Sequence, residues 1–242
     1  MLSDSKVIKS ANDEVRSEIL ATIRRQLAAS EPYDTVRNEH AQHQAPHIQS
    51  TIPTAWGDGT TIAAVERFAE ALTAVAGHCA IVQDEAQAAE VLKQIIEGNR
   101  ACRIAVSDSA LVHRVVEKLD RNFELLANPS AAELFDCDIG ITSAQWALAE
   151  TGTLVLESER ERHRLVSLVP AVHIAIISAL SVRHTLREVL AEINESGREG
   201  LSRTVTFITG PSRTSDIELT LAIGVHGPAE LYVIIVEGPD NG

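Results

Sequence analysis

The sequence predicts an α/β fold in which a mostly parallel sheet is flanked by helices. From residue 61 onward, segments with apolar residues at every third or fourth position alternate with short runs rich in Val and Ile. The helical segments between these runs are long enough for the crossovers that join parallel strands. A chain of 242 residues, of which 45% are hydrophobic, is also long enough to bury one large core.

The N-terminal 58 residues differ in composition from the rest of the chain. Within Asn12–Ala29, apolar residues recur at every fourth position with charges between them, which is typical of an amphipathic helix. Ser30–Asp58 is rich in Pro, His and Gln and has few apolar residues, which favours an extended, solvated arm. We therefore expect an N-terminal helix and extended arm over 1–58 and a single domain over 59–242.

The first half of that domain alternates regularly between helices and strands. Each segment with helical periodicity is followed by a short apolar run that ends near polar or small residues. We expect helices at Thr61–Ala76, Glu85–Glu97 and Asp108–Leu119, and strands at Cys79–Gln83, Cys102–Ser107 and Phe123–Ala127.

The second half is richer in strands and contains one clear helix, Ser181–Asn194, with apolar residues on one face. Alternating apolar and polar residues predict a strand over Asp216–Val225. The segment Glu157–Arg164 is too charged to be buried, so we expect an exposed loop between two strands. The other expected strands are Asp138–Thr142, Gly152–Glu157, Leu165–Leu168, Val172–Ser178, Thr204–Ile208 and Leu231–Val236.

The net charge limits the partners of the chain. Lys and Arg number 21 against 34 Asp and Glu, which gives a formal charge of -13, so the average field repels phosphate backbones and anionic lipid. The apolar stretches are shorter than the about 20 residues that span a bilayer, and Met1–Ala11 lacks the apolar core of a secretory signal. We expect a cytoplasmic protein that binds no nucleic acid and does not insert into a membrane.

The cysteines of the chain are Cys79, Cys102 and Cys137, which lie far apart in the sequence and form no C-x-x-C pair. Three scattered thiols do not supply the four ligands of an ordinary iron–sulfur cluster or of a structural zinc. The histidines of the N-terminal arm have helix-like spacing, but their setting is polar and proline-bounded. We expect reduced thiols, no bound metal and no cofactor in this chain.

Glu150 is a candidate catalytic residue. It is the only charged residue between Asp138 and Glu157, and Thr151 and Gly152, candidate ligand contacts, follow it directly. A carboxylate in apolar surroundings is suited to a raised pKa and to nucleophile or base chemistry. The alternative is structural, with Glu150 capping the end of a strand or pairing with an arginine.

The loop Thr209–Asp216 follows an apolar strand and is a second candidate site. It offers a permissive glycine, hydroxyl groups and a fork-shaped guanidinium, a set that suits a carboxylate or a phosphate. The lysine and glycine spacing of a P-loop are absent. The alternative is a rigid turn in which Asp216 bonds Arg213 or nearby backbone N–H groups. The candidate ligand contacts are Gly210, Ser212, Arg213, Thr214 and Asp216.

His173 and His226 lie in or beside apolar strands and are candidates for a base or a proton relay, with a satisfied, partly buried histidine as the alternative for each. In open α/β sheets, ligands bind beyond the carboxyl ends of the strands. A bidentate bond to an arginine there would hold a small carboxylate. We expect six residues to converge on one such pocket, namely Glu150, Arg164, His173, Ser212, Arg213 and Asp216.

Five motifs occur in a fixed order along the domain, namely Cys137–Thr142, Ala149–Leu156, Ser167–Ile174, Gly210–Glu218 and His226–Leu231. Together they resemble the lactate utilisation protein C family, also called the LUD-domain family. The resemblance covers roughly Thr61–Val236.

The resemblance implies a fold similar to the superfamily of sugar-phosphate isomerases and coenzyme A transferases (NagB/RpiA/CoA transferase-like). It implies an accessory subunit of iron–sulfur-dependent L-lactate oxidation to pyruvate, whose cysteine-rich partner subunits carry the clusters, with a small carboxylate as a candidate ligand. It leaves open whether this chain is itself an enzyme. The alternative is a stand-alone coenzyme A transferase-like or sugar-phosphate isomerase-like enzyme, because the Glu-Thr-Gly at Glu150 is similar to the Glu-x-Gly of the transferases.

Overall fold

The computed structural model describes residues 59–120, 122–158, 164–195, 202–215, 221–223 and 227–238. All of them belong to one compact unit, Pro46–Gly242. The predicted N-terminal helix and arm over 1–58 and the charged residues 159–163 lie outside the described residues.

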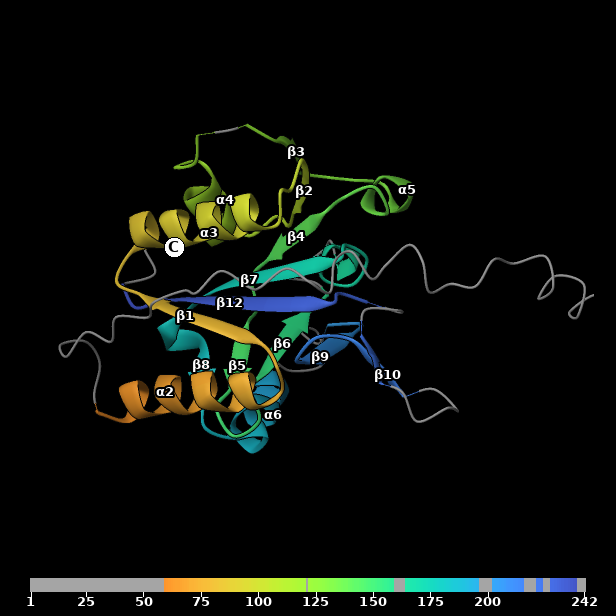
Figure 1. Cartoon of the computed structure of the whole chain (residues 1–242). Helices are drawn as coiled ribbons and strands as arrows, with labels where there is room; N and C mark the ends of the chain where they lie inside the picture. The colour runs from red at the N-terminus through yellow and green to blue at the C-terminus, as the bar shows by residue number, and fades with distance from the viewer. Residues whose placement is uncertain are drawn as a thin grey trace, which may run out of the picture. The chain divides into compact units, whose positions relative to one another are not determined.

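A six-stranded parallel sheet forms the centre of this unit (Figure 1), in agreement with the fold class that the sequence predicts. Every pair of neighbouring strands in it is parallel. The strand order is β1-β12-β7-β4-β2-β3, so β1 pairs with the strand that is most distant from it in the sequence. The strands are β1 (His78–Val82), β2 (Arg103–Val106), β3 (Glu124–Leu126), β4 (Ile139–Thr142), β7 (Val172–Ser178) and β12 (Glu230–Val236).

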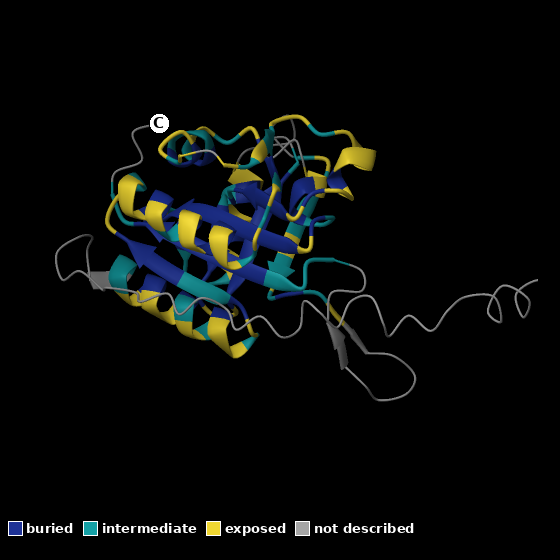
Figure 2. Ribbon diagram, turned by 45° about the horizontal axis from the view of Figure 1, so that its top comes forward, coloured by how far each residue is buried: buried dark blue, intermediate teal, exposed yellow. Residues whose placement is uncertain are grey.

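Helices cover both faces of the sheet (Figure 1). On one face, α3 (Glu85–Gly98) and α4 (Ala110–Val116) bury their apolar sides against the sheet. Helix α3 begins where the carboxylate of Asp84 accepts hydrogen bonds from two backbone N–H groups of its first turn. On the other face lies α2 (Gly59–Ala74), whose Phe68 and Leu72 are fully buried. Figure 2 shows the buried strands between helices that are exposed on their outer sides.

A second sheet, which the sequence analysis does not anticipate, lies on the same face as α2. It contains β5 (Trp146–Leu148), β6 (Thr153–Glu157), β8 (Val182–Arg183) and β9 (Val205–Thr209) in the order β8-β5-β6-β9. Alternate side chains of β5 and β6 point toward the six-stranded sheet, and the others point toward α6 (Leu186–Glu195). The residues predicted as strands of one sheet are therefore divided between two sheets.

Three local predictions are wrong. The expected strand Leu165–Leu168 is a 3-10 helix, η3 (Arg164–Ser167), because four residues carry too little periodicity to distinguish the two. The expected helix Ser181–Asn194 begins later than predicted. Ser181 is the last residue of a 3-10 turn, η4 (Ala179–Ser181), β8 follows it, and α6 begins only at Leu186. Glu157 is only 3% exposed, because it is the last residue of β6 and not part of an exposed loop.

Two short elements complete the described fold. Helix α5 (Ala131–Leu134) begins with a capping box at Ser130. Strands β10 (Arg213–Ser215) and β11 (Leu221–Ile223) pair antiparallel, whereas the remainder of the strand predicted over Asp216–Val225 lies outside the described residues. None of the described helices is both long and apolar enough to cross a membrane.

Candidate functional site

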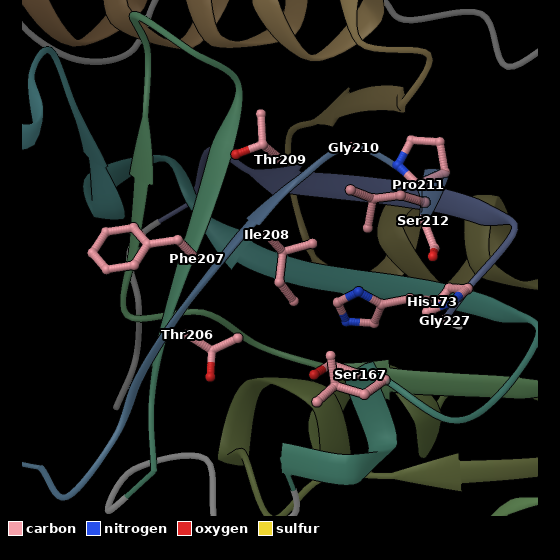
Figure 3. A pocket seen from close by; sticks show the side chains of 13 residues that line it. Ser167, His173, Thr206, Phe207, Ile208, Thr209, Gly210, Pro211, Ser212 and Gly227 are labelled. Carbon is pink, nitrogen blue, oxygen red and sulfur yellow. The ribbon is translucent and has the colours of Figure 1, made fainter. Parts of the chain in front are cut away.

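A pocket of about 230 Å³ lies between the six-stranded sheet and strand β9 of the second sheet (Figure 3). His173 and Leu231 line it, and each is the second residue of its strand, β7 or β12. The pocket therefore lies at the amino ends of these strands. The prediction from the sequence, a pocket at the carboxyl ends, is wrong. The lining residues are Ser167, Leu168, His173, Thr206, Phe207, Ile208, Thr209, Gly210, Pro211, Ser212, Gly227, Pro228 and Leu231.

His173 is the most distinctive group in this pocket. The residue is 1% exposed, and its Nε2 atom lies 2.8 Å from the hydroxyl oxygen of Thr142 on β4. Its Nδ1 atom is buried and has no hydrogen-bond partner. Burial lowers the pKa of His173 from 6.5 to about 3. The imidazole is therefore neutral near pH 7 and presents one unused nitrogen.

The position of η3 beside the pocket depends on Gly140 in β4. A Cβ atom at Gly140 would lie 1.9 Å from the carbonyl oxygen of Val166, so only a glycine allows η3 to lie this close to the strand. This contact brings Ser167 to the pocket wall. The hydroxyl of Ser167 donates a hydrogen bond to the carbonyl oxygen of Arg164 at 2.8 Å, which closes the turn of η3.

The opposite wall is the loop that follows β9. The backbone N–H of Ser212 donates to the carbonyl oxygen of Pro228 at 2.8 Å, which joins this loop to the segment before β12. In Figure 3 the hydroxyl of Ser212 points toward the side of the pocket on which the His173 ring lies. The lining combines hydroxyl groups and one imidazole with apolar side chains, and among its described residues none is an acid, a lysine or an arginine. This arrangement can bind a small molecule through hydrogen bonds.

Arg213 does not line the pocket. Its Nη2 atom donates to the carbonyl oxygen of Val75 at 2.8 Å, directly after the C-terminus of α2. Helix α2 has no basic residue in its last turn, so the guanidinium supplies the positive charge that stabilises a helix C-terminus.

Glu150 also has a structural partner. Its Oε1 atom accepts a hydrogen bond from the backbone N–H of Leu186 at 2.8 Å, at the first residue of α6. The residue is exposed and lies outside the pocket lining. Its carboxylate therefore caps a helix N-terminus, close to the structural alternative that the sequence analysis left open.

The segments around Gly152 and Gly210 both lie against α2. Gly152 and Gly210 both have positive φ values, +66° and +80°, and a Cβ atom at either would lie less than 3.0 Å from the α2 chain or the residue that follows it. Thr153 pairs with Thr209 between them, and their hydroxyl oxygens are 2.7 Å apart. The hydroxyl of Thr151 lies 2.7 Å from that of Thr153. The segments around Gly152 and Gly210 therefore pack helix α2 against the second sheet.

The structure thus brings together only part of the predicted pocket. His173, Gly210 and Ser212 line it, whereas Glu150, Arg164 and Arg213 do not. Arg164 is exposed at the start of η3, and Thr214 belongs to β10. Asp216 and His226 lie outside the described residues.

Two contributions to the site were not predicted. Thr142 orients the His173 ring, and Gly140 admits η3. Both lie on one face of β4, and their i, i+2 spacing in a predicted strand could have indicated a shared face. The register that places Gly140 opposite His173 has no local sequence signal. The part of the chain that the structure describes contains no group of three or more His, Cys, Asp or Glu residues that could hold a metal ion.

Comparison with known proteins assigns the domain. The LUD domain family matches residues 65–236. Two relatives, each named lactate utilization protein C, come from Halalkalibacterium halodurans (43% identical over 102 residues) and Deinococcus radiodurans (41% identical over 108 residues). The first alignment covers 41% of this chain and 44% of the relative, and the second covers 44% of this chain and 50% of the relative. The chain therefore spans about half the length of the curated relatives that it matches.

A solved structure is similar over most of the domain. It is the crystal structure of a DUF162 family protein from Deinococcus radiodurans, with a TM-score of 0.56 and 25% sequence identity. The similarity covers 73% of this chain and 98% of that chain.

Proposed function

Since this chain belongs to the LUD domain family, we propose that it serves lactate utilisation in the cytoplasm as an accessory subunit. In this role it binds partner subunits that carry iron–sulfur clusters and perform the oxidation of L-lactate to pyruvate. It also binds a small carboxylate. The observation that carries the proposal is the family match over residues 65–236, together with the shared name of the curated relatives.

The composition of the chain supports a division of labour between subunits. An ordinary iron–sulfur cluster needs four cysteine ligands, and this sequence contains three cysteines that lie in different parts of the fold. Cys137 is buried, and burial raises the pKa of the Cys79 thiol to about 12. Cys79 and Cys137 are thus suited to packing, and the exposed Cys102 alone cannot hold a cluster. The proposal therefore gives electron transfer to the partners.

The geometry at Glu150 gives no support to a transferase mechanism. A glutamate nucleophile must present a free carboxylate oxygen to a thioester. Glu150 uses Oε1 to accept a backbone N–H at the start of α6, and the residue lies outside the pocket lining, so no described pocket would hold a thioester against its other oxygen.

Deletion of the gene tests the role in lactate utilisation. The deletion strain should fail to grow on L-lactate and grow normally on pyruvate, because the defect precedes pyruvate. A plasmid copy of the full chain should restore growth. Normal growth of the deletion strain on L-lactate, with no other lactate dehydrogenase present, would contradict the proposal.

Affinity purification tests the accessory role. The tagged full chain, isolated from cells grown on L-lactate, should co-purify with cysteine-rich iron–sulfur proteins, which are identified by mass spectrometry and iron content. The same preparation from cells grown on pyruvate is the control for non-specific capture. The chain purified alone should not reduce an artificial electron acceptor with L-lactate, and robust turnover by it would assign the catalysis to this subunit.

A further inference from the structure

We propose that the pocket beside His173 binds a small 2-hydroxy or 2-oxo carboxylate together with one proton, which His173 takes up at Nδ1. The inference rests on the proposed function, which supplies the chemical class of the ligand. It deepens that function by assigning the binding site, the residue that contacts the carboxylate and a pH dependence of binding.

The pocket contains a buried ring nitrogen that has no hydrogen-bond partner, His173 Nδ1. Among the described residues, the buried side-chain nitrogen and oxygen atoms without a hydrogen-bond partner are His173 Nδ1 and Glu237 Oε2, and only His173 lines the pocket. A buried polar atom without a partner costs free energy. A ligand in the pocket that forms a hydrogen bond to Nδ1 removes this cost.

The described lining of the pocket offers a carboxylate no cation. A carboxylate that entered this pocket alone would lose its hydration without meeting a cation, because no described lining residue is charged. Protonation of Nδ1 supplies the compensating positive charge at the point where the ligand binds. The ligand and the proton then enter the pocket as a neutral pair.

The described acidic residues near His173 are engaged in other contacts, so the positive charge that compensates the ligand must come from the imidazole itself. Asp138, before β4, accepts the backbone N–H groups of Cys102 and Arg103 at 2.7 and 2.9 Å. Glu230, at the start of β12, accepts the hydroxyl of Tyr232.

The nearby arginines are also directed elsewhere. Arg213 donates to the end of α2, and Arg164 is exposed on η3. Strand β9, Val205–Thr209, contains no titratable side chain. Burial is the cause of the lowered pKa of His173. Among the described lining residues, none carries a charge that would compete with an anion at Nδ1.

The proton balance is simple. The atoms Thr142 Oγ1 and His173 Nε2 are 2.8 Å apart, a distance that either tautomer allows. The proposal assigns the tautomer in which Nε2–H donates to Thr142, so that Nδ1 carries a lone pair. Binding adds one proton from solvent to Nδ1, which then donates to the ligand carboxylate, while the contact with Thr142 is unchanged. No covalent bond forms or breaks in the ligand.

The size and lining of the pocket fit such a ligand. At about 30 Å³ for each water, a volume of about 230 Å³ holds a three-carbon acid and several waters. The hydroxyl groups of Thr206 and Ser212 lie in the same lining as His173 and can bond the 2-hydroxy or 2-oxo group. Leu168, Ile208 and Leu231 provide apolar contacts for its methyl group.

Isothermal titration calorimetry of the full chain with L-lactate and with pyruvate tests the proposal. The dissociation constant should rise about tenfold per pH unit between about pH 6 and about pH 8, because each bound anion requires one proton. Titrations in PIPES and in Tris, whose ionisation enthalpies differ, should give an uptake of about one proton per ligand. Lactamide, the neutral isostere of lactate, should bind without proton uptake.

The variant His173→Gln keeps a hydrogen-bond partner for Thr142 but cannot titrate. It should lose the pH dependence and bind L-lactate at about pH 6 at least tenfold more weakly. His113→Gln, on α4 across the sheet, is the matched control and should behave like the wild type. If His173→Gln does not fold, the proton count of the wild-type chain decides the question.

Three results would overturn the inference. The first is that neither acid binds at about pH 6. The second is binding that does not change with pH, which would assign the positive charge to an arginine such as Arg164. The third is pH-dependent binding that persists in His173→Gln. The growth and affinity purification experiments do not depend on this pocket. Failure of the pocket inference and failure of the proposed function can therefore be distinguished.

Discussion

At Gly140, a single hydrogen atom in place of a side chain determines how closely η3 approaches β4. A methyl group there would lie 1.9 Å from the carbonyl oxygen of Val166, which belongs to the backbone and cannot rotate away. We expect Gly140→Ala to lower the free energy of unfolding by about 1–3 kcal/mol or more, as overpacking does in other cores.

Urea unfolding measures this change. Gly98→Ala, in the last position of α3 and without a positive φ, is the control and should leave stability unchanged or slightly raised. Equal stability of Gly140→Ala and the wild type would show that η3 moves freely relative to β4.

The buried imidazole of His173 also predicts how stability depends on pH. Its pKa in the folded state is lowered to about 3 from 6.5, so below pH 6.5 the unfolded chain binds a proton that the folded chain does not. This residue therefore makes the protein less stable as the pH falls from 6.5 toward 3, by about 1.4 kcal/mol per pH unit. Above pH 6.5 its contribution is constant.

Urea unfolding at about pH 7 and about pH 5 compares the wild type with His173→Gln. The variant should lose about 2 kcal/mol less than the wild type over this interval. His113→Gln should retain the wild-type loss. Parallel pH profiles for all three proteins would contradict the burial of a neutral imidazole.

At the scale of the element, Arg213 links a short strand to a helix terminus. Loss of its hydrogen bond to Val75 removes the only cation that the described structure directs at the end of α2. We expect Arg213→Gln to lower the free energy of unfolding by about 0.3–1 kcal/mol and to leave carboxylate binding unchanged. The control is Arg67→Gln, an exposed position in the middle of the same helix. A large loss of carboxylate binding in Arg213→Gln would show that this arginine contributes to the binding site.

Glu150 has the corresponding role at the N-terminus of α6. Glu150→Ala removes the acceptor for the Leu186 N–H and should cost about 0.5–2 kcal/mol of stability. Glu150→Gln keeps an acceptor oxygen and should cost less. Hydroxylamine trapping after incubation with coenzyme A thioesters should leave Glu150 unmodified, and a hydroxamate at this residue would contradict its assignment as a cap.

The elements show which features of this fold are encoded locally. Strands β4, β7 and β12 are continuous apolar runs, as is typical of strands buried on both faces, and the sequence predicts them to within one residue. Helix α3 has both a strong period and an Asp cap, and it is predicted equally well. Strands β5 and β8 have three and two residues, which is too short for a periodic signal, so they were not predicted.

At the scale of the whole molecule, the site was only partly predictable because it depends on which sheet each strand joins. From the sequence, β6 and β9 are expected to belong to the parallel sheet, and this would bring Glu150 and Arg213 to its carboxyl edge. In the structure these strands form a separate sheet, and the pocket opens at the amino ends of β7 and β12. His173 was predicted because a histidine is unusual within an apolar strand, and Ser212 because its polar loop directly follows an apolar strand. That these two residues line the same pocket depends on the packing of distant strands, which local sequence patterns do not predict.

The charge of the whole chain gives a further prediction. With a formal charge of -13 at pH 7, self-repulsion opposes the compact state. Raising NaCl from about 0.05 M to about 0.5 M shortens the Debye length and should raise Tm at pH 7. Near the isoelectric point, pI ≈ 5.1, the same addition should have little effect. A fall in Tm with salt at pH 7 would show that attractive ion pairs, such as Arg114–Glu85, outweigh the repulsion.

The pairing of β1 with β12 determines when the central sheet can be completed during synthesis. Among the described strands, β12 is the single neighbour of β1, and the chain runs from Val82 to Glu230 between them. At about 5–20 residues per second, a ribosome needs roughly 7 to 30 s for this stretch. Until β12 emerges, the apolar residues of β1 have no strand to pair with in this sheet, so the nascent chain exposes them and is a natural client for a chaperone.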